Sequence, residues 1–469
     1  MKHPMPQLAS GAASRCSLLG GRLVGPVVLA DKLVTAHPAV PTDRVGTVQL
    51  VDQVCDLHLA DGRIVAIGRA PEGFHAEHII DVRGLCVAPG LVDLAARLRE
   101  PGFEYKATLE SEMQAALAGG VTSLSCPPDT DPPLDEPGLV EMLKHRARGL
   151  QAASLYPLGA LTTGLRGEAI TEMAELAEAG CIGFAHPGPL FADTQVLLRA
   201  MQYAHSFGFT LWLQPGDYYL SRGGVAHSGA VAGRLGLSGV PVIAETVALH
   251  TIFALMRATG ARVHLCRVSS AQGVELIAQA RQEGLAVSAD VAVHHVHLTD
   301  VDIGYFDANL RVDPPFRTQR DREALRAALR SGVIDAVCSD HTPVDDDEKQ
   351  LPFAEAAPGS SGLELLLPLS LKWAAESGVS LALAIDRITR QPARIMRVDA
   401  GVLAVGASAD LCIFDPDEAW VVGAPSLCSQ GRHTPFAGCE LLGRTRLTMV
   451  GGRVVLDRRA ARGLDGGVA

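Results

Sequence analysis

Three short segments of this sequence gather side chains that can bind metals, protons or anions. VAVHHVHLT holds His294, His295 and His297, and CSDHTP holds Asp340. Imidazoles and carboxylates bind transition metals and transfer protons near neutral pH. The third segment, LVDLAARLREPG at 91–102, presents guanidinium groups, which have no free lone pair for a metal. The question is whether these segments meet in one site, and whether that site still does chemistry.

Two interpretations stay open for Arg99, which lies in the Arg-Glu-Pro-Gly turn of the third segment. Its guanidinium could bind a small anion, or it could brace the turn by pairing with Glu100. The histidines are also ambiguous. In an extended strand His295 and His297 would share one face, and both could then contact one metal.

The elements that must position these residues alternate between strand-like and helix-like patterns over 89–395. Helical segments such as TLESEMQAALAGG and AITEMAELAEAG stop at glycine, and apolar strand-like runs such as VTSLSC and FTLWL stand between them. The segment LAVSADVAVHHVHLT is among those expected to be a strand. This repeated pattern favours a parallel sheet, and its length favours a TIM barrel over an open sheet. Chemistry then belongs at the carboxyl ends of the strands.

Both ends of the chain have a β pattern. Residues 22–88 and 396–460 contain short apolar runs with turns, and ADGRIVAIG has the Asp-Gly signal of a hairpin. The sequence predicts one small β-sandwich built from both segments. Residues 1–21, rich in Ser, Gly and Ala, are expected to be a disordered tail.

The composition limits the kinds of partner. A net charge of −11 argues against a nucleic-acid groove, and the apolar runs are too short to favour a membrane span. The ten cysteines include no C-x-x-C pair, which argues against a zinc ribbon or a redox motif. We expect a cytoplasmic protein that handles small molecules or protein partners.

Ordered motifs over about 22–456 resemble the dihydroorotases of the amidohydrolase superfamily. They include APGLVDL with LREPGFEYK, GGVTSLSCPPDT, HLCRVSS, HHVHLTD, VDPPFR, GVIDAVCSDHTP and GASADLCIFDP. The resemblance implies a TIM barrel of the amidohydrolase type with a composite β-sandwich. It also implies zinc, which in this family generates the hydroxide that opens a cyclic amide.

The residues at the family's zinc-ligand positions depart from that pattern. Ala95 and Arg97 stand where the family has His-x-His, and His186 lies in the AHPG loop where a carboxylate is usual. Gln214 and Arg267 stand at two further histidine positions, and Asp340 alone matches the family ligand. The resemblance therefore implies a protein without the family's zinc or another cofactor.

The substrate pocket that the resemblance implies is also altered. Arg99 remains and would face a substrate carboxylate, whereas Asp129 and Asp313 replace two asparagines and Val344 replaces a histidine. Because His294 and His295 occur in the family without forming its primary zinc site, they are interpreted as structural.

We predict that Asp340 pairs with Arg97, Arg267 or both, within about 6 Å, because a guanidinium can supply the charge that zinc once held. Arg97 is expected where a zinc ion would lie. A rebuilt metal site that recruits His186 and His264 is the alternative.

The pattern most resembles the noncatalytic dihydroorotase-like subunits of bacterial aspartate transcarbamoylase. It implies a pseudoenzyme of de novo pyrimidine synthesis that assembles with the catalytic transcarbamoylase chain in a mixed hetero-oligomer. Two alternatives stay open. One is an active cyclic amidohydrolase with a rebuilt metal site, and the other is a small-molecule sensor with a metal-free pocket around Arg99.

Overall fold

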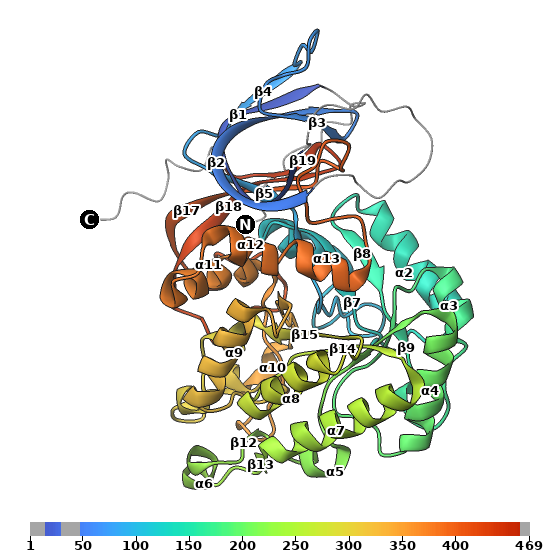
Figure 1. The fold of residues 1–469 in the computed structure, drawn as a ribbon. Coiled ribbons are helices and arrows are strands. Elements are labelled where there is room, and N and C mark those ends of the chain that lie inside the picture. Colours follow the sequence, from blue (N-terminus) through green and yellow to red (C-terminus); the bar gives the residue numbers. More distant parts are fainter. Residues whose placement is uncertain (1–14, 30–46, 460–469) are drawn as a thin grey trace.

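The computed structural model describes residues 15–29 and 47–459, which form a barrel and a curved sheet, the capping sheet, that packs on one side of it (Figure 1). Parallel strands form the barrel wall and follow the chain in order. They are β6 (Leu91–Asp93), β7 (Val121–Cys126), β8 (Ser154–Pro157) continued by β9 (Gly159–Ala160), β10 (Phe184–His186), β11 (Thr210–Leu213), β14 (Arg262–Leu265), β15 (Val287–Ala292) and β16 (Ala336–Cys338). A parallel bridge between Ala96 and His341 closes the wall. The TIM barrel predicted from the βα pattern is confirmed.

Helices surround the strands on the outside of the barrel (Figure 1). The longer ones are α1 (Leu109–Ala118), α2 (Pro137–Gly149), α3 (Met173–Ala179), α4 (Thr194–Phe207), α7 (Val242–Thr259), α8 (Ala271–Gln282), α9 (Gln319–Ser331), α11 (Leu366–Ser377), α12 (Leu381–Arg387) and α13 (Arg390–Met396). Shorter elements lie in the connections: α5 (Tyr218–Ser221), β12 (Ala226–His227), α6 (Ala230–Leu235), β13 (Gly239–Val240) and α10 (Asp346–Gln350).

Local sequence signals begin and end these helices. The Thr318 side chain accepts a hydrogen bond from the backbone of α9, and Asp193 does the same at the start of α4. Gly208 ends α4 with φ of 71°, a left-handed conformation that glycine adopts at least cost. Capping signals in the sequence therefore set where α4 and α9 begin and where α4 ends.

Helix α7 is the one helix of the described chain that is long and apolar enough to cross a membrane. It packs against α4 and α8 in the outer layer of the barrel. Its buried residues include Leu249, Ile252 and Phe253. These buried residues form the face of α7 that packs on its neighbours.

The capping sheet combines both ends of the chain, as predicted. Its strands are β1 (Cys16–Leu29), β2 (Thr47–Ala60), β3 (Arg63–Ile67), β4 (His78–Asp81), β5 (Cys86–Pro89), β17 (Leu411–Val421), β18 (Glu440–Val450) and β19 (Arg453–Asp457). The order is β19-β18-β17-β5-β1-β2-β3, with β4 beside β1. Strand β5 joins the two halves, because it pairs with β1 on one side and β17 on the other. Helices α11 and α12 pack between this sheet and the barrel (Figure 1).

The expected disordered tail over 1–21 is wrong for its last part. Strand β1 begins at Cys16 and pairs with β2 from there, and Cys16 and Leu18 are buried in the core of the sheet. Pairing with β2 and burial of Cys16, Ser17 and Leu18 outweigh the small polar residues that suggested disorder. Residues 1–14 lie outside the described chain. The predicted Asp-Gly hairpin is present, since Asp61 and Gly62 join β2 to β3 with φ of 52° and 73°.

Candidate functional site

The carboxyl ends of the barrel strands bring the sequence-predicted residues together. Arg97 follows β6, Gln214 follows β11, Arg267 follows β14 and Asp340 follows β16. Parallel strands in a barrel end at the same rim, so residues far apart in sequence meet there. Arg267 and Asp340 are 7 % and 4 % exposed, which leaves both charges inside the protein.

Arg267 occupies the centre of this group. Its Nη1 lies 3.1 Å from Asp340 Oδ1 and donates to the carbonyl oxygen of Asp313 at 3.0 Å. Its Nη2 donates to Gln214 Oε1. The Gln214 amide in turn donates to Asp313 Oδ2 at 3.3 Å. The Gln214 side chain is thus oriented by arginine on one side and a carboxylate on the other.

Arg97 approaches the same carboxylate from β6. Its Nη1 lies 3.6 Å from Asp340 Oδ1, and it donates from Nε to Asp129 at 2.6 Å and from Nη1 to Thr342 at 3.0 Å. The predicted pairing of Asp340 with both arginines is confirmed. Arg267 makes the closer contact, whereas the strongest partner of Arg97 is Asp129.

Burial and charge compete in this network. Burial raises the pKa of Asp340, while Arg267 and Arg97 oppose that shift. Burial likewise acts to raise the pKa of Asp129, but Arg97 and Arg99 outweigh it and leave that pKa below its usual range. For Arg267 burial favours loss of the proton, but Asp340 and Asp313 raise its pKa above the ordinary value. The arginines thus hold the pKa of Asp129 down, whereas burial outweighs them at Asp340.

The backbone at the rim is held in an uncommon conformation. Arg99, Arg267 and Asp340 have φ of 64°, 56° and 47°, in the left-handed region that side chains other than glycine rarely adopt. Such positions persist where surrounding contacts determine the direction of a side chain. Here the left-handed turns occur at residues whose charged groups point into one site.

Arg99 lies beside an open pocket of about 270 Å³. Its lining includes the residues predicted from the substrate side of the site, Arg99, Asp129 and Asp313, together with Arg97, Arg267 and Asp340. Arg99 Nε donates to the carbonyl oxygen of Pro343 at 2.8 Å. Burial, and then the charge of Arg97, lower its pKa to about 10. The pocket therefore presents a guanidinium that can meet an anion.

The alternative that Glu100 pairs with Arg99 is wrong. Glu100 accepts a hydrogen bond from the backbone of Leu109 at 2.7 Å and pairs with Arg146. It ties the turn to α1 and α2 instead, which leaves the Arg99 guanidinium to Pro343 and the pocket.

His186 and Ala95 line a second, smaller cavity of about 30 Å³ in the barrel interior. His186 is buried, its ring meets Phe191 edge to face at 4.9 Å, and its Nδ1 has no hydrogen-bond partner in the described chain. Burial lowers the pKa of His186 to about 4, so the ring is neutral at pH 7. Trp212 also lines this cavity, which is mostly apolar.

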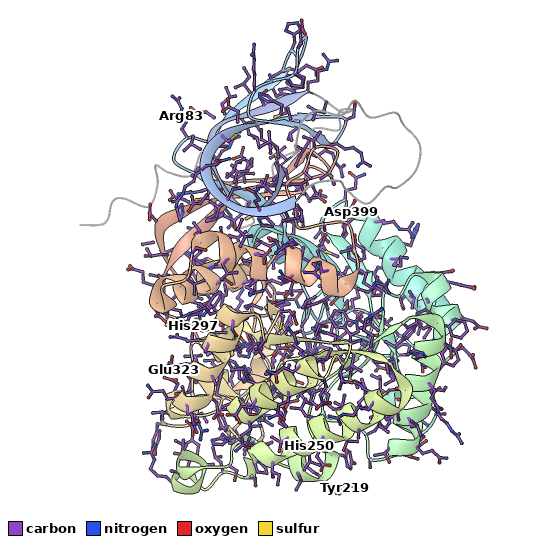
Figure 2. The ribbon with its side chains drawn as sticks, viewed as in Figure 1. Arg83, Tyr219, His250, His297, Glu323 and Asp399 are labelled. Carbon is purple, nitrogen blue, oxygen red and sulfur yellow. The ribbon has the colours of Figure 1, made fainter. Side chains whose placement is uncertain are left out.

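The three histidines of the sequence motif do not lie on one strand face. Strand β15 ends at Ala292, and residues 293–296 form a 3-10 turn, so the extended strand expected here is wrong. His297 lies beside α11 (Figure 2), and its Nε2 is 2.8 Å from the Leu369 carbonyl oxygen. His294 lies 3.7 Å from Asp340, and burial lowers its pKa to about 3.

The sequence analysis named His264 as a possible ligand but missed Cys266 and Asp290, which lie beside it near Arg267. One donor atom each of His264, Cys266 and Asp290 lie within 4.8 Å of one another. His264 contacts Asp290 and Ser288, each at 2.9 Å, and Asp290 also accepts the backbone N–H of Arg267 at 2.6 Å. The signal was the His-x-Cys spacing of His264 and Cys266 at the end of β14. Burial raises the Cys266 pKa, which opposes the thiolate that a metal prefers.

The donor set around Asp340 does not fit the zinc that the family resemblance implies. Ala95 offers no donor atom, and Arg97 and Arg267 bring positive charge to the remaining carboxylate. The Gln214 oxygen already accepts from Arg267. Zinc requires several neutral or anionic donors around one point, and the guanidinium groups occupy the carboxylate that would serve.

Comparison with known proteins agrees with the sequence motifs and the barrel. Residues 84–273 match the dihydro-orotase-like family and residues 244–455 the amidohydrolase family. A dihydroorotase-like protein of Pseudomonas aeruginosa is 46% identical over 404 residues, 86% of this chain and 95% of its own. A dihydroorotase of Geobacter sp. (strain M21) is 37% identical over 87% of this chain and 96% of its own.

The structure of L-hydantoinase (dihydropyrimidinase) from Arthrobacter aurescens has the same fold. It superposes with a TM-score of 0.80 at 24% identity over 95% of this chain and 96% of the hydantoinase. The family motifs, the closed barrel with its composite sheet and the identity to these relatives lead to one assignment. The chain belongs to the dihydroorotase-like family of the amidohydrolase superfamily.

Proposed function

We propose that this protein is a catalytically inactive dihydroorotase homologue that serves as an assembly subunit of aspartate transcarbamoylase in the cytosol. The observation that carries the proposal is the contact of Arg267 with both Asp340 and Gln214. A hydrolase of this family needs a metal-bound hydroxide beside that aspartate. Two guanidinium groups directed at the same carboxylate oppose the binding of a cation there.

The scaffold role is supported by what the chain retains. The barrel and the composite sheet are intact, with apolar residues buried throughout both. A homologue without catalytic activity that keeps a complete fold still has surfaces on which a partner protein can bind specifically. Its relatives in Pseudomonas are named dihydroorotase-like proteins, whereas more distant ones are named dihydroorotases. We propose the catalytic transcarbamoylase chain as the partner, in a mixed hetero-oligomer.

Co-expression with the transcarbamoylase chain of the same organism tests the assembly role. We expect one complex on size-exclusion chromatography, and transcarbamoylase activity that depends on this chain. Wild-type protein and Asp340→Asn should support that activity equally, provided that circular dichroism shows both are folded. Two separate elution peaks, with activity independent of this chain, would sink the proposal.

An active amidohydrolase is the second candidate, and the His264, Cys266 and Asp290 group is the observation that favours it. Metal analysis of the purified protein and a dihydroorotate assay distinguish the two candidates. Our proposal predicts substoichiometric zinc and no turnover. Stoichiometric zinc that is lost in Cys266→Ser, together with turnover, would establish the rebuilt site instead.

A sensor role rests on the Arg99 pocket and is tested by thermal shift with carbamoyl aspartate and dihydroorotate. A ligand that binds the native state raises the melting temperature. A shift that disappears in Arg99→Gln would favour sensing, and the scaffold proposal expects none.

A further inference from the structure

A second cavity opens at the opposite end of the barrel, where the strands begin. Its volume is about 380 Å³. Thr210, Arg262 and Val287 are the first residues of β11, β14 and β15, and all three line it. The other lining residues are Leu285, Ala286, Ser288, Asp335, Gln391, Arg394, Ile395 and Arg397. The cavity is thus separated from the rim that holds Asp340 by the length of the barrel.

Two arginines converge on one atom at this cavity. Arg262 Nη1 and Arg397 Nη1 donate to the same carbonyl oxygen, that of Gly208, at 3.3 and 3.2 Å. Gly208 ends α4, and a helix C-terminus favours positive charge. Each guanidinium uses one of its five N–H donors on that carbonyl, so both keep donors for a ligand. Within residues 15–29 and 47–459, neither arginine forms an ion pair.

Arg394, in the last turn of α13, adds a third guanidinium, and it lines the cavity together with Arg397, which directly follows the helix. Across the part of the chain that the structure describes, the Arg394 side chain has no hydrogen bond and no ion pair. Asp335 is the carboxylate of the lining, and it is already bound by Arg281 and by the backbone of Ala289. Among the described residues, none of the three arginines therefore forms an ion pair with a carboxylate.

The backbone at Arg397 strengthens this interpretation. Arg397 has φ of 59° at the end of α13, a conformation in which glycine or asparagine costs less. In this conformation the Arg397 side chain reaches the Gly208 carbonyl and the lining of the cavity. Like charges held close together without a carboxylate repel each other, and an anion between them removes that cost.

We propose that this cavity binds a phosphorylated small molecule, with Arg262, Arg394 and Arg397 on its phosphate groups. Guanidinium groups match phosphate oxygens in charge and in planar geometry. The remaining wall suits the rest of such a ligand, because Leu285, Val287 and Ile395 are apolar and Ser288 and Gln391 offer hydrogen bonds. Its volume lies in the range of small-molecule sites. The site is noncatalytic, and it does not depend on the assembly role proposed above.

Titration calorimetry on the full chain tests this site, with inorganic pyrophosphate and ATP as probes. We expect both to bind, and Arg394→Gln combined with Arg397→Gln to weaken binding by about tenfold or more. Arg320→Gln is the matched control. Arg320 is an exposed arginine in the first turn of α9, at the other end of the barrel, and its loss should leave the affinity unchanged.

The two probes distinguish the sources of phosphate. Tighter binding of ATP than of pyrophosphate supports a ligand with an apolar part against Ile395, and equal affinities support recognition of phosphate alone. Absence of binding at millimolar concentrations of both probes would overturn the proposal. So would binding that survives the double substitution, or binding of an acidic peptide in place of both probes.

Discussion

At the scale of single residues, Arg267 is the side chain that most affects what the site at the strand ends can bind. It is nearly fully buried and contacts Asp340, Gln214 and the Asp313 carbonyl. A buried charge is tolerated when its partners are charged or polar and well placed, and becomes costly when one partner is removed. The arginine therefore stabilises the fold through the same contacts that exclude a metal.

Substitution of Arg267 tests this dependence. Arg267→Met should lower the free energy of unfolding by about 3–5 kcal/mol, because it leaves the Asp340 carboxylate buried without its nearest partner. Urea unfolding monitored by circular dichroism measures the loss. In the double variant with Asp340→Leu the loss should be smaller than the sum of the two single losses by about 1–3 kcal/mol. Additive losses would show that the two side chains are not coupled.

Buried histidines predict a loss of stability in acid. His186 and His294 have pKa values of about 4 and 3 in the folded chain, against an ordinary value near 6.5, because burial disfavours the charged ring. As pH falls below 6.5 the unfolded chain takes up protons that the folded chain does not. Each ring should then reduce the free energy of unfolding by up to about 1.4 kcal/mol per pH unit.

Urea unfolding between pH 7 and pH 4.5 measures this effect. His186→Gln should make the pH dependence shallower than in the wild type. His250→Gln, at an exposed position on α7, should leave it unchanged (Figure 2). An unchanged slope in His186→Gln would contradict a neutral His186 in the folded state.

At the scale of elements, α1 fixes the loop that carries Asp340. Glu112 of α1 is fully buried and lies 2.6 Å from His341 Nε2, next to Asp340 in the chain. Glu112 also accepts hydrogen bonds from Ser429 and from the backbone of Gln430, at 2.7 and 3.0 Å. One carboxylate thus joins a barrel helix, the end of β16 and a segment near the carboxyl terminus.

Removal of this carboxylate should loosen all three elements together. Glu112→Ala should lower the free energy of unfolding by about 3 kcal/mol, because the donors at His341 and Ser429 lose their acceptor while buried. Glu110→Ala, at an exposed position in the same turn of α1, should change it by less than about 0.5 kcal/mol. Equal effects in chemical unfolding would show that Glu112 does not hold the loop.

At the scale of the whole molecule, the capping sheet depends on both ends of the chain. Strand β17 pairs with β5, and Leu411, Ile413 and Phe414 of β17 are fully buried. Helices α11 and α12 pack on the same sheet. The sheet therefore joins the two end segments of the chain, and some of its buried side chains are also part of the barrel core.

Truncation tests this interdependence. A chain that ends at residue 409 lacks β17, β18 and β19, and should be insoluble because it exposes the apolar face of β1 and an unpaired edge of β5. Co-expression of residues 405–469 as a separate polypeptide should restore soluble protein. A truncated chain that stays soluble and melts at the wild-type temperature would contradict this account.

Local signals account for much of the fold. The Asp61-Gly62 turn, the Gly208 stop of α4 and the βα pattern depend on neighbouring residues, and each could be predicted from the sequence. The strand expected over His294 and His295 was wrong, because an apolar run with histidines has no period that separates a strand from a turn.

The sequence by itself determined the family and the barrel. It also determined that Ala95, Arg97 and Arg267 cannot bind a metal, because the type of side chain fixes whether it carries an atom with a free lone pair. The tertiary structure decided which charges pair. It joined Arg267 to Asp340 and Gln214, turned Arg97 mainly to Asp129, and gathered Arg262 and Arg397 at the far end of the barrel. These contacts join residues that are far apart in the chain. Which residues pair depends on which strand ends and helix ends become neighbours when the barrel closes.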